Sequence, residues 1–178
     1  IDLINQTKIK LAYEIKILFE SSLIALRQKR KIILIGNGGS FSIAQHISAE
    51  FTGRFHADRE SIPSIVLGSN PSSFSAIAND YGYETSFKRE LSSLGQKGDL
   101  LIAMSTSGKS KNIIETIKKA EEMEIKSFFL TGSADNNLKL NKIYIKIPSL
   151  QTYLIQEMHF FILHDLCKYI DLYPTSAN

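Results

Sequence analysis

The stretch Lys31-Ile-Ile-Leu-Ile-Gly-Asn-Gly-Gly-Ser40 decides the fold of this chain. Its four consecutive apolar residues, three of them β-branched, predict a short strand buried on both faces, as in parallel sheets. The run Gly36-Asn-Gly-Gly39 predicts a tight turn, and Ser40 stands where the N-cap of a following helix is expected. A strand, a glycine turn and a helix N-terminus together form a natural cradle for an anion or a polyol.

The helix expected after this turn carries two kinds of side chain. Ile43, Ile47 and Phe51 are spaced four residues apart and form one apolar stripe for the core. His46 and Glu50 have the same spacing and project together from a neighbouring face. Such a pair can handle a metal ion or a proton, although a His–Glu pair on a helix is more often part of a solvated face.

The rest of the chain alternates between apolar strands and amphipathic helices. Strands are expected at 31–35, 63–67, 99–104, 126–130 and 143–147, and helices at 3–28, from 40 to a polar loop at 54–61, and at 74–79, 84–94, 110–124 and 152–172. This alternation predicts an α/β fold with a three-layer, doubly wound, five-stranded parallel sheet of flavodoxin-like order. We expect residues 1–30 to form a long helix packed on the domain and on an oligomer partner, and residues 31–178 to form one domain.

Composition limits the classes of function. The chain has 178 residues, 43% hydrophobic and 22% charged, which is typical of a globular protein, and its net charge of +3 is too small to indicate nucleic acid binding. No apolar run reaches the length of a membrane span. The single Cys167 excludes an internal disulfide and fits a reducing cytoplasm, so we expect a cytoplasmic location. Phe41 stands where the dinucleotide fingerprint requires a third glycine, so no nucleotide cofactor is expected.

A second turn rich in small polar residues follows the strand expected at 99–104. Ser105-Thr-Ser-Gly-Lys-Ser110 offers four hydroxyl groups and several backbone N–H groups at a helix N-terminus. That combination suits a phosphate monoester. The first glycine of a nucleotide P-loop is missing, and the alternative is a serine-rich helix cap with no ligand.

The last helix carries two histidines, His159 and His164. At about 100° per residue they point about 140° apart, with Gln156 between them, so they can hardly serve one site together. The geometry of the helix alone does not choose between the two.

Several motifs follow one another in a characteristic order. They are Gly-Asn-Gly-Gly-Ser40, Gln45-His46, Ala49-Glu50, Thr52-Gly-Arg54, Asn79-Asp80-Tyr-Gly82, Ser105-Thr-Ser-Gly-Lys-Ser110, Leu130-Thr-Gly132 and Ile155-Gln-Glu-Met-His159. Together they resemble the phosphoheptose isomerases of the sugar isomerase (SIS) domain superfamily, over essentially all of residues 31–171. Each motif alone is modest, and their combination is specific.

The resemblance implies a reaction and a site. That family converts sedoheptulose 7-phosphate to D-glycero-D-manno-heptose 7-phosphate through an enediol, for bacterial heptose used in lipopolysaccharide or capsule. By resemblance, Glu50 and His164 are the catalytic base and acid, and a zinc ion is held by His46, Glu50, Gln156 and His164. Substrate contacts are implied for Asn37, Gly38, Gly39, Ser40, Glu50, Asn79, Asp80, Ser105, Thr106, Ser107, Ser110 and Gln156. The resemblance also implies a homotetramer with active sites at the subunit interfaces.

Two other functions remain as alternatives. One is a non-catalytic SIS-domain protein of the replication initiator-associating type, which binds a protein partner. Those relatives lack the acidic residue and the histidine found here as Glu50 and His164. The other is an isomerase for another phosphosugar, such as an amino-hexose phosphate. The segments Gln45-His46 and Ile155-Gln-Glu157 argue against it.

Two helices are more apolar than a single domain requires. The apolar face of residues 3–28 spreads over more than one side of the helix. In the last helix, residues 160–163 are consecutive large apolar residues and cover the full circumference. A helix that is apolar all round must be buried on all sides, so association with other copies is expected.

Overall fold

The structure of the protein, a computed structural model, describes residues 1–134 and 142–173. Its centre is a parallel sheet of five strands in the order β2-β1-β3-β4-β5. The strands are β1 (Ile32–Ile35), β2 (Ser64–Val66), β3 (Leu100–Ser105), β4 (Lys126–Thr131) and β5 (Ile143–Lys146). The flavodoxin-like order expected from the sequence is confirmed.

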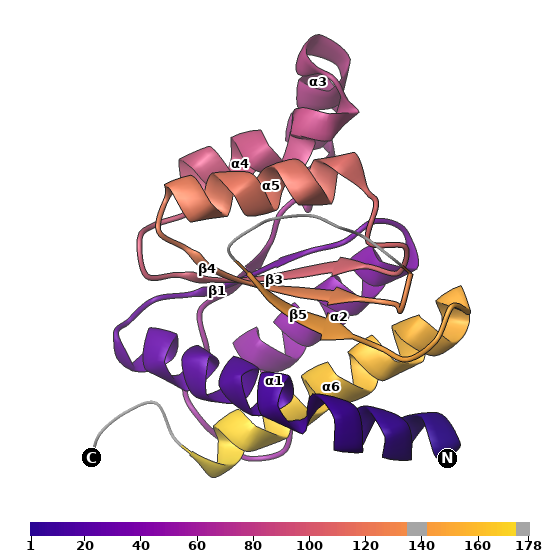
Figure 1. Ribbon diagram of the computed structural model, residues 1–178. Helices are drawn as coiled ribbons and strands as arrows, with labels where there is room; N and C mark the ends of the chain where they lie inside the picture. Colours follow the sequence, from indigo (N-terminus) through magenta and orange to yellow (C-terminus); the bar gives the residue numbers. More distant parts are fainter. Residues whose placement is uncertain (135–141, 174–178) are drawn as a thin grey trace.

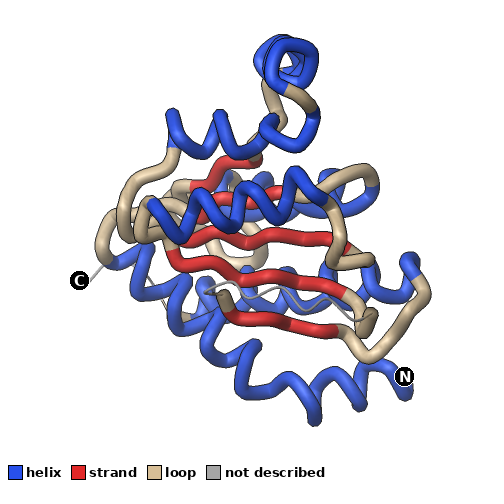
Figure 2. Tube along the Cα trace, turned by 45° about the horizontal axis from the view of Figure 1, so that its top comes forward, coloured by secondary structure: helices blue, strands red, loops and turns tan. Residues whose placement is uncertain are grey.

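Helices cover both faces of this sheet, so the predicted three-layer architecture is also confirmed. They are α1 (Asp2–Arg27), α2 (Gly39–Thr52), α3 (Pro71–Tyr81), α4 (Ser86–Leu94), α5 (Lys111–Glu122) and α6 (Thr152–Leu172). α4 and α5 lie on one face, α1, α2 and α6 lie on the other, and α3 projects away from the body of the domain (Figure 1). Figure 2 shows the strands in red between these two layers of blue helices.

The alternation of side chains along each strand builds two cores. In β1, Ile32 and Leu34 join the larger core under α1, α2 and α6, whereas Ile33 and Ile35 join the core under α4 and α5. Every residue of β1 is buried, as is every residue of β3. A strand enclosed on both faces has no polar side, which is why the sequence pattern of β1 is continuously apolar.

The entry of the chain into β1 is tied to its entry into β3 by a buried carboxylate. Asp99, just before β3, accepts the backbone N–H of Lys31 at 3.1 Å and pairs with the Lys31 ammonium at 2.7 Å. Its second oxygen also accepts the backbone N–H of Gln96 at 2.8 Å. The Asp99 side chain is only 1% exposed, so these bonds provide its charge with partners in place of water. They fix how β1 and β3 align.

Helix α2 does not begin as the sequence suggested. The prediction that Ser40 caps it was wrong: the N-cap is Gly38, and Ser40 lies buried inside the first turn. Gly38 has a φ of +54°, a left-handed conformation that favours glycine, so the chain turns into the helix earlier. Gly36 is also required, because a Cβ there would lie 2.6 Å from the Ser40 backbone.

Two other helix boundaries differ from the sequence-based expectation. α3 begins at Pro71, three residues before the predicted start, because the side chain of Asn70 accepts the N–H groups of Ser72 and Ser73. The segment predicted as one helix at 84–94 begins with a short 3-10 turn, η1 (Tyr83–Thr85), before α4. Local polar caps thus moved the boundaries without changing the order of elements.

Within residues 1–134 and 142–173, no helix combines the length and apolar character needed to cross a bilayer. Cys167 is buried in the core, as expected, and burial raises the pKa of its thiol to about 12.

His159 is the largest polar group enclosed by the core. It is completely buried on α6, and neither ring nitrogen has a hydrogen-bond partner within the described parts of the chain. The nearby backbone of Thr131 acts to raise the pKa of this ring, although it does not lie in hydrogen-bond geometry with either ring nitrogen. Burial dominates and lowers the pKa of His159 from 6.5 to about 4, so the folded protein keeps this ring neutral.

This buried ring makes stability depend on pH. The unfolded chain binds a proton at His159 as the pH falls through 6.5, whereas the folded chain does so only near 4. The contribution of the neutral ring to the free energy of unfolding is therefore fully present above pH 6.5. It is lost as the pH falls towards 4, which lowers the free energy of unfolding by about 3 kcal/mol. We expect His159→Leu to remove this part of the pH dependence in urea unfolding experiments.

The exposed His56 provides the control, because His56→Gln should leave the same pH dependence in place. An unchanged pH profile in His159→Leu would show that His159 is not the group responsible.

Candidate active site

Two of the candidate segments, the turns after β1 and β3, lie at the carboxyl edge of the sheet. From β1 the chain leaves towards β2, and from β3 it leaves in the opposite direction towards β4. Two turns therefore diverge from neighbouring strands: the glycine turn after β1, residues 36–39, and the serine loop after β3, residues 105–110. The crevice between two such turns is the usual ligand site of a sheet of this kind.

Two histidines and a glutamate meet further along α2 and α6. Nε2 of His164 on α6 lies 3.3 Å from Nε2 of His46 on α2. The same nitrogen of His46 lies 3.2 Å from a carboxylate oxygen of Glu50, one turn along α2. Helix geometry alone did not choose between the two histidines of α6. In the structure, His164 lies with His46 and Glu50, whereas His159 points into the core. We call these three residues the His–Glu–His cluster.

Aromatic rings surround His164. Phe55 stacks on it at 5.6 Å between ring centres, and Phe160 packs on it at 4.1 Å. Burial and the nearby ring of His46 lower the pKa of His164, and the carboxylates of Glu50 and Asp165 oppose them. A lowered pKa keeps the imidazole neutral near pH 7, where it can both accept and donate a proton.

The cluster offers donor atoms suited to zinc. Two ligands of one tetrahedral zinc lie about 3.4 Å apart, since Zn–N bonds are about 2.0–2.1 Å long. The 3.3 Å between the histidine nitrogens and the 3.2 Å between His46 and Glu50 match that separation. Within the described residues, however, no group of three His, Cys, Asp or Glu side chains is arranged to hold a metal ion. The two pairs that share His46 have suitable separations, but the three side chains together do not form a metal site in this structure.

Gln156, the fourth residue implied as a zinc ligand, lies against the glycine turn. A Cβ added to Gly39 would stand 2.6 Å from the side-chain nitrogen of Gln156. The amide therefore lies directly over the backbone of the turn, and any larger residue at position 39 would displace it. This contact brings α6 to the crevice.

The serine loop is arranged as an anion site. The hydroxyls of Ser105 and Ser110 lie 3.0 Å apart, and the Ser107 hydroxyl accepts the backbone N–H of Lys109. Ser110 is the N-cap of α5, but its side chain makes no capping hydrogen bond. The Ser110 side chain thus leaves the start of α5 without a cap, while Thr106, the remaining hydroxyl residue, is half-buried.

The glycine turn holds the residues expected to contact the sugar. Gly38 and Gly39 are exposed, whereas Ser40 is only 3% exposed and faces inward. A cavity of about 420 Å³ opens beside Asn37 and Gly38, walled by aromatic rings that include Phe41 and Tyr83.

Asn79 and Asp80 lie elsewhere. Both are exposed near the end of the projecting helix α3, where the Asn79 amide donates to the Asp80 carboxylate at 2.8 Å. In the described part of the chain, neither makes a hydrogen bond to another candidate residue. The single chain therefore does not bring these two residues to the His–Glu–His cluster.

An ion pair missed in the sequence holds the loop that carries Phe55. Asp171 at the end of α6 pairs with Arg59 at 2.7 Å and accepts the backbone N–H groups of His56 and Ala57. These bonds lower the pKa of Asp171 in spite of its burial, which acts in the opposite direction.

Arg59 also reaches α2. Its guanidinium donates to the backbone carbonyls of Glu50 and Phe51, at 2.8 and 3.0 Å. We call Arg59 and Asp171 the end clamp, because they join the C-terminal ends of α2 and α6, the two helices that carry the His–Glu–His cluster. The only sequence signal was a charged loop after α2.

A second missed contact is an amide pair. Asn37 in the glycine turn and Asn112 in the first turn of α5 exchange two hydrogen bonds, both at 2.9 Å. The hydroxyl of Tyr83 in η1 donates to the side-chain oxygen of Asn37, which also accepts from Asn112, again at 2.9 Å. Nothing in the sequence pattern links these three positions.

An α/β domain with a serine loop at a helix N-terminus is typical of proteins that bind sugar phosphates. Residues 1–132 match the profile of the SIS domain family. Among curated proteins, the phosphoheptose isomerase of a Nitratiruptor species is 47% identical over 83% of this chain and 79% of its own length. That of Helicobacter pylori is 43% identical over 86% of this chain and 80% of its own. The chain belongs to the phosphoheptose isomerase family of SIS-domain proteins.

Solved structures agree with this assignment. The phosphoheptose isomerase GmhA from Neisseria gonorrhoeae superposes with a TM-score of 0.88 at 33% identity, covering 96% of this chain and 92% of that one. A phosphoheptose isomerase from Francisella tularensis gives a TM-score of 0.86 at 32% identity, with 94% and 92% coverage. The resemblance drawn from the motifs is thereby confirmed, and the enzyme is favoured over the two alternatives.

Proposed function

We propose that the protein isomerises sedoheptulose 7-phosphate to D-glycero-D-manno-heptose 7-phosphate, for bacterial heptose synthesis in the cytoplasm. The observation that carries this proposal is the His–Glu–His cluster, which joins α2 and α6. Relatives with 42–47% identity are named for this activity. The serine loop at the carboxyl edge of the sheet is suited to the phosphate of the substrate.

The reaction moves a proton between neighbouring carbons. The carboxylate of Glu50 removes a proton from C1 of the ketose, and the electrons of that bond form the C1–C2 double bond of an enediol. The neutral ring of His164 gives a proton to the C2 oxygen and takes one from the C1 oxygen. Glu50 then returns its proton to C2, which completes the aldose. No atom is gained or lost overall.

His46, Glu50, Gln156 and His164 are the residues that would hold one zinc ion. When bound, the ion supplies positive charge that stabilises the oxygens of the enediolate. A carboxylate held tightly by zinc is a weaker base, so we propose that the bond from Glu50 is loose. The product would serve lipopolysaccharide or capsule precursors.

Removal of the proton-transfer groups tests the catalytic roles. Glu50→Gln keeps the shape of the side chain but cannot accept the C1 proton, and His164→Gln cannot shuttle the oxygen proton. Each should lower turnover of sedoheptulose 7-phosphate by at least ~10²-fold. Glu60→Gln and His56→Gln, at exposed positions, are the matched controls. Near-normal turnover in either test variant would refute its assigned role.

Metal analysis tests the zinc site. Protein purified without a chelator should contain about one zinc ion per chain, and His46→Ala should lose it, because this residue is common to both ligand pairs. A glutamine oxygen is an unusual ligand, so other divalent ions should substitute after chelation. The proposal fails if the protein binds no metal and EDTA leaves its activity unchanged.

Exposed apolar side chains support a homotetramer. On α1, Ile9 and Tyr13 are 80% and 72% exposed, and on α6 Tyr153 and Phe161 are 64% and 45% exposed. An exposed apolar surface of this kind favours association, and active sites at the interfaces would bring Asn79 and Asp80 of one subunit near the cluster of another.

Light scattering should therefore give four times the mass of the chain. Ile9→Asp with Phe161→Asp should dissociate the tetramer and abolish turnover, because a charge cannot be buried unpaired. Leu94→Asp places the same charge on the opposite face of the sheet and should leave the tetramer intact. A stable and active monomer would contradict this assembly.

A further inference from the structure

One hydrogen-bonded group connects all three segments that were expected to hold the substrate. Asn37 comes from the glycine turn, Asn112 from the first turn of α5 behind the serine loop, and Tyr83 from η1, which follows Asn79 and Asp80. We call these residues the linking triad. Each contributes one side chain, and the three bonds between them are all 2.9 Å long.

Most of the hydrogen-bonding capacity of the Asn37 side chain is used within the protein. Its side-chain oxygen accepts from both Asn112 and Tyr83, which fills the two lone pairs. One of its two amide hydrogens is donated to Asn112. Among the described residues, one N–H of the Asn37 amide has no partner, so the main contacts of this side chain are with the protein.

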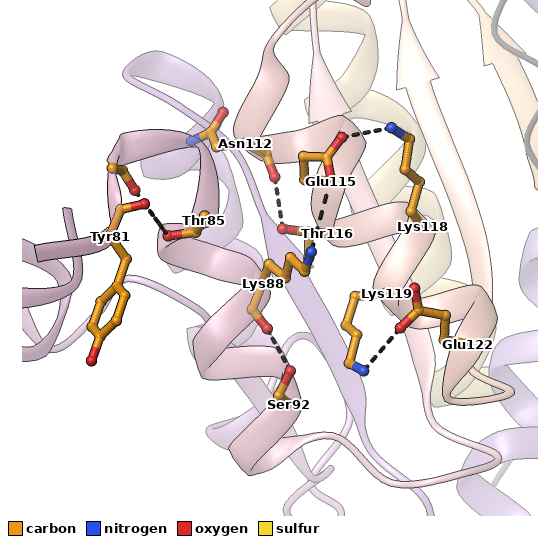
Figure 3. A network of polar contacts seen from close by, with 11 residues as sticks. Tyr81, Thr85, Lys88, Ser92, Asn112, Glu115, Thr116, Lys118, Lys119 and Glu122 are labelled. Carbon is orange, nitrogen blue, oxygen red and sulfur yellow. Dashed lines mark hydrogen bonds and ion pairs between the residues drawn. The ribbon is translucent and has the colours of Figure 1, made fainter.

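Asn112 is held in place from every side. It is 2% exposed, and its oxygen also accepts the backbone N–H of Ile113 at 3.0 Å. Its own carbonyl accepts the Thr116 hydroxyl at 2.7 Å, a bond drawn in Figure 3. A buried amide with its hydrogen bonds satisfied has one stable orientation, and breaking a bond leaves an unpaired polar group.

The segment that carries Tyr83 is fixed in the same way. The Thr85 hydroxyl donates to the carbonyls of Tyr81 and Gly82, and Figure 3 shows the first of these bonds. The Tyr83 ring meets Phe74 of α3 edge to face, with 5.8 Å between ring centres. Its hydroxyl is thus aimed at Asn37 by contacts on both sides of η1.

We infer that Asn112 and Tyr83 are positioning residues that couple the serine loop to the glycine turn. Because Asn112 has one orientation, an anion that restrains the start of α5 also restrains Asn37 and the backbone of the glycine turn through it. Binding of the phosphate end then places the reacting carbons by the cluster, which converts binding energy into rate. This inference rests on the proposed function, because it assumes that the serine loop takes the phosphate.

Turnover provides the first test. Asn112→Ala removes both amide bonds and should lower kcat for sedoheptulose 7-phosphate about 10²-fold, the scale expected when reacting groups are misplaced. Competitive inhibition by inorganic phosphate should change less than about 3-fold, because the serine loop keeps its own hydroxyls. Tyr83→Phe removes one bond and should lower kcat about 5–10-fold.

Tyr81→Phe is the matched control for Tyr83→Phe. It removes a phenol hydroxyl two residues away that makes no hydrogen bond within the described residues, so kcat should stay within about 2-fold of wild type. Equal losses in the two tyrosine variants, or a phosphate affinity that falls in parallel with kcat in Asn112→Ala, would overturn the inference.

Hydrogen exchange provides a test that needs no isomerase activity. In the wild-type protein, inorganic phosphate should slow amide exchange in both the serine loop and the glycine turn. In Asn112→Ala it should slow exchange in the serine loop alone. Protection confined to the serine loop in wild type, or unchanged protection of both in the variant, would refute the coupling. A wild-type enzyme that is coupled but inactive on sedoheptulose 7-phosphate would contradict only the proposed reaction.

Discussion

The register between β1 and β3 is the constraint on which the rest of the structure depends. Asp99 sets it from the amino edge of the sheet, where one buried carboxylate bonds both the backbone and the ammonium of Lys31. At the opposite edge the same register brings the glycine turn next to the serine loop. A slip of one residue would turn every side chain of β1 to the wrong core and separate the two turns. The spacing of the glycine turn and the serine loop is therefore decided in part at the far end of the strands.

The fold could be predicted almost completely, because its signals are local. Continuous apolar runs marked the strands, and glycine and serine turns marked the edge. The site could be predicted only in part. Helix geometry showed that His159 and His164 face apart, but the choice of His164 depends on α2, more than 100 residues away in the chain. The pair of Asn37 with Asn112 spans 75 residues and that of Arg59 with Asp171 spans 112, so no sequence period reveals them. Ser40 was misplaced because the φ of Gly38 decided where α2 begins.

Two kinds of contact surround the His–Glu–His cluster, namely aromatic packing on His164 and the charged hydrogen bonds of the end clamp. The rings of Phe55 and Phe160 pack on the half-buried His164, and this partial burial lowers its pKa. Charged hydrogen bonds of the end clamp act further back, where Arg59 secures the last turns of α2 and Asp171 secures the loop of Phe55.

Helix α3 has a different status from the rest of the domain. None of its residues is buried, and it projects beyond the layer formed by α4 and α5 (Figure 1). An element with so little enclosed surface opens locally at low free energy, well before the sheet unfolds. In a single chain it is therefore open to proteolytic cleavage, and any subunit packed against it would protect it. Resistance of α3 to a protease would thus report assembly at concentrations too low for scattering.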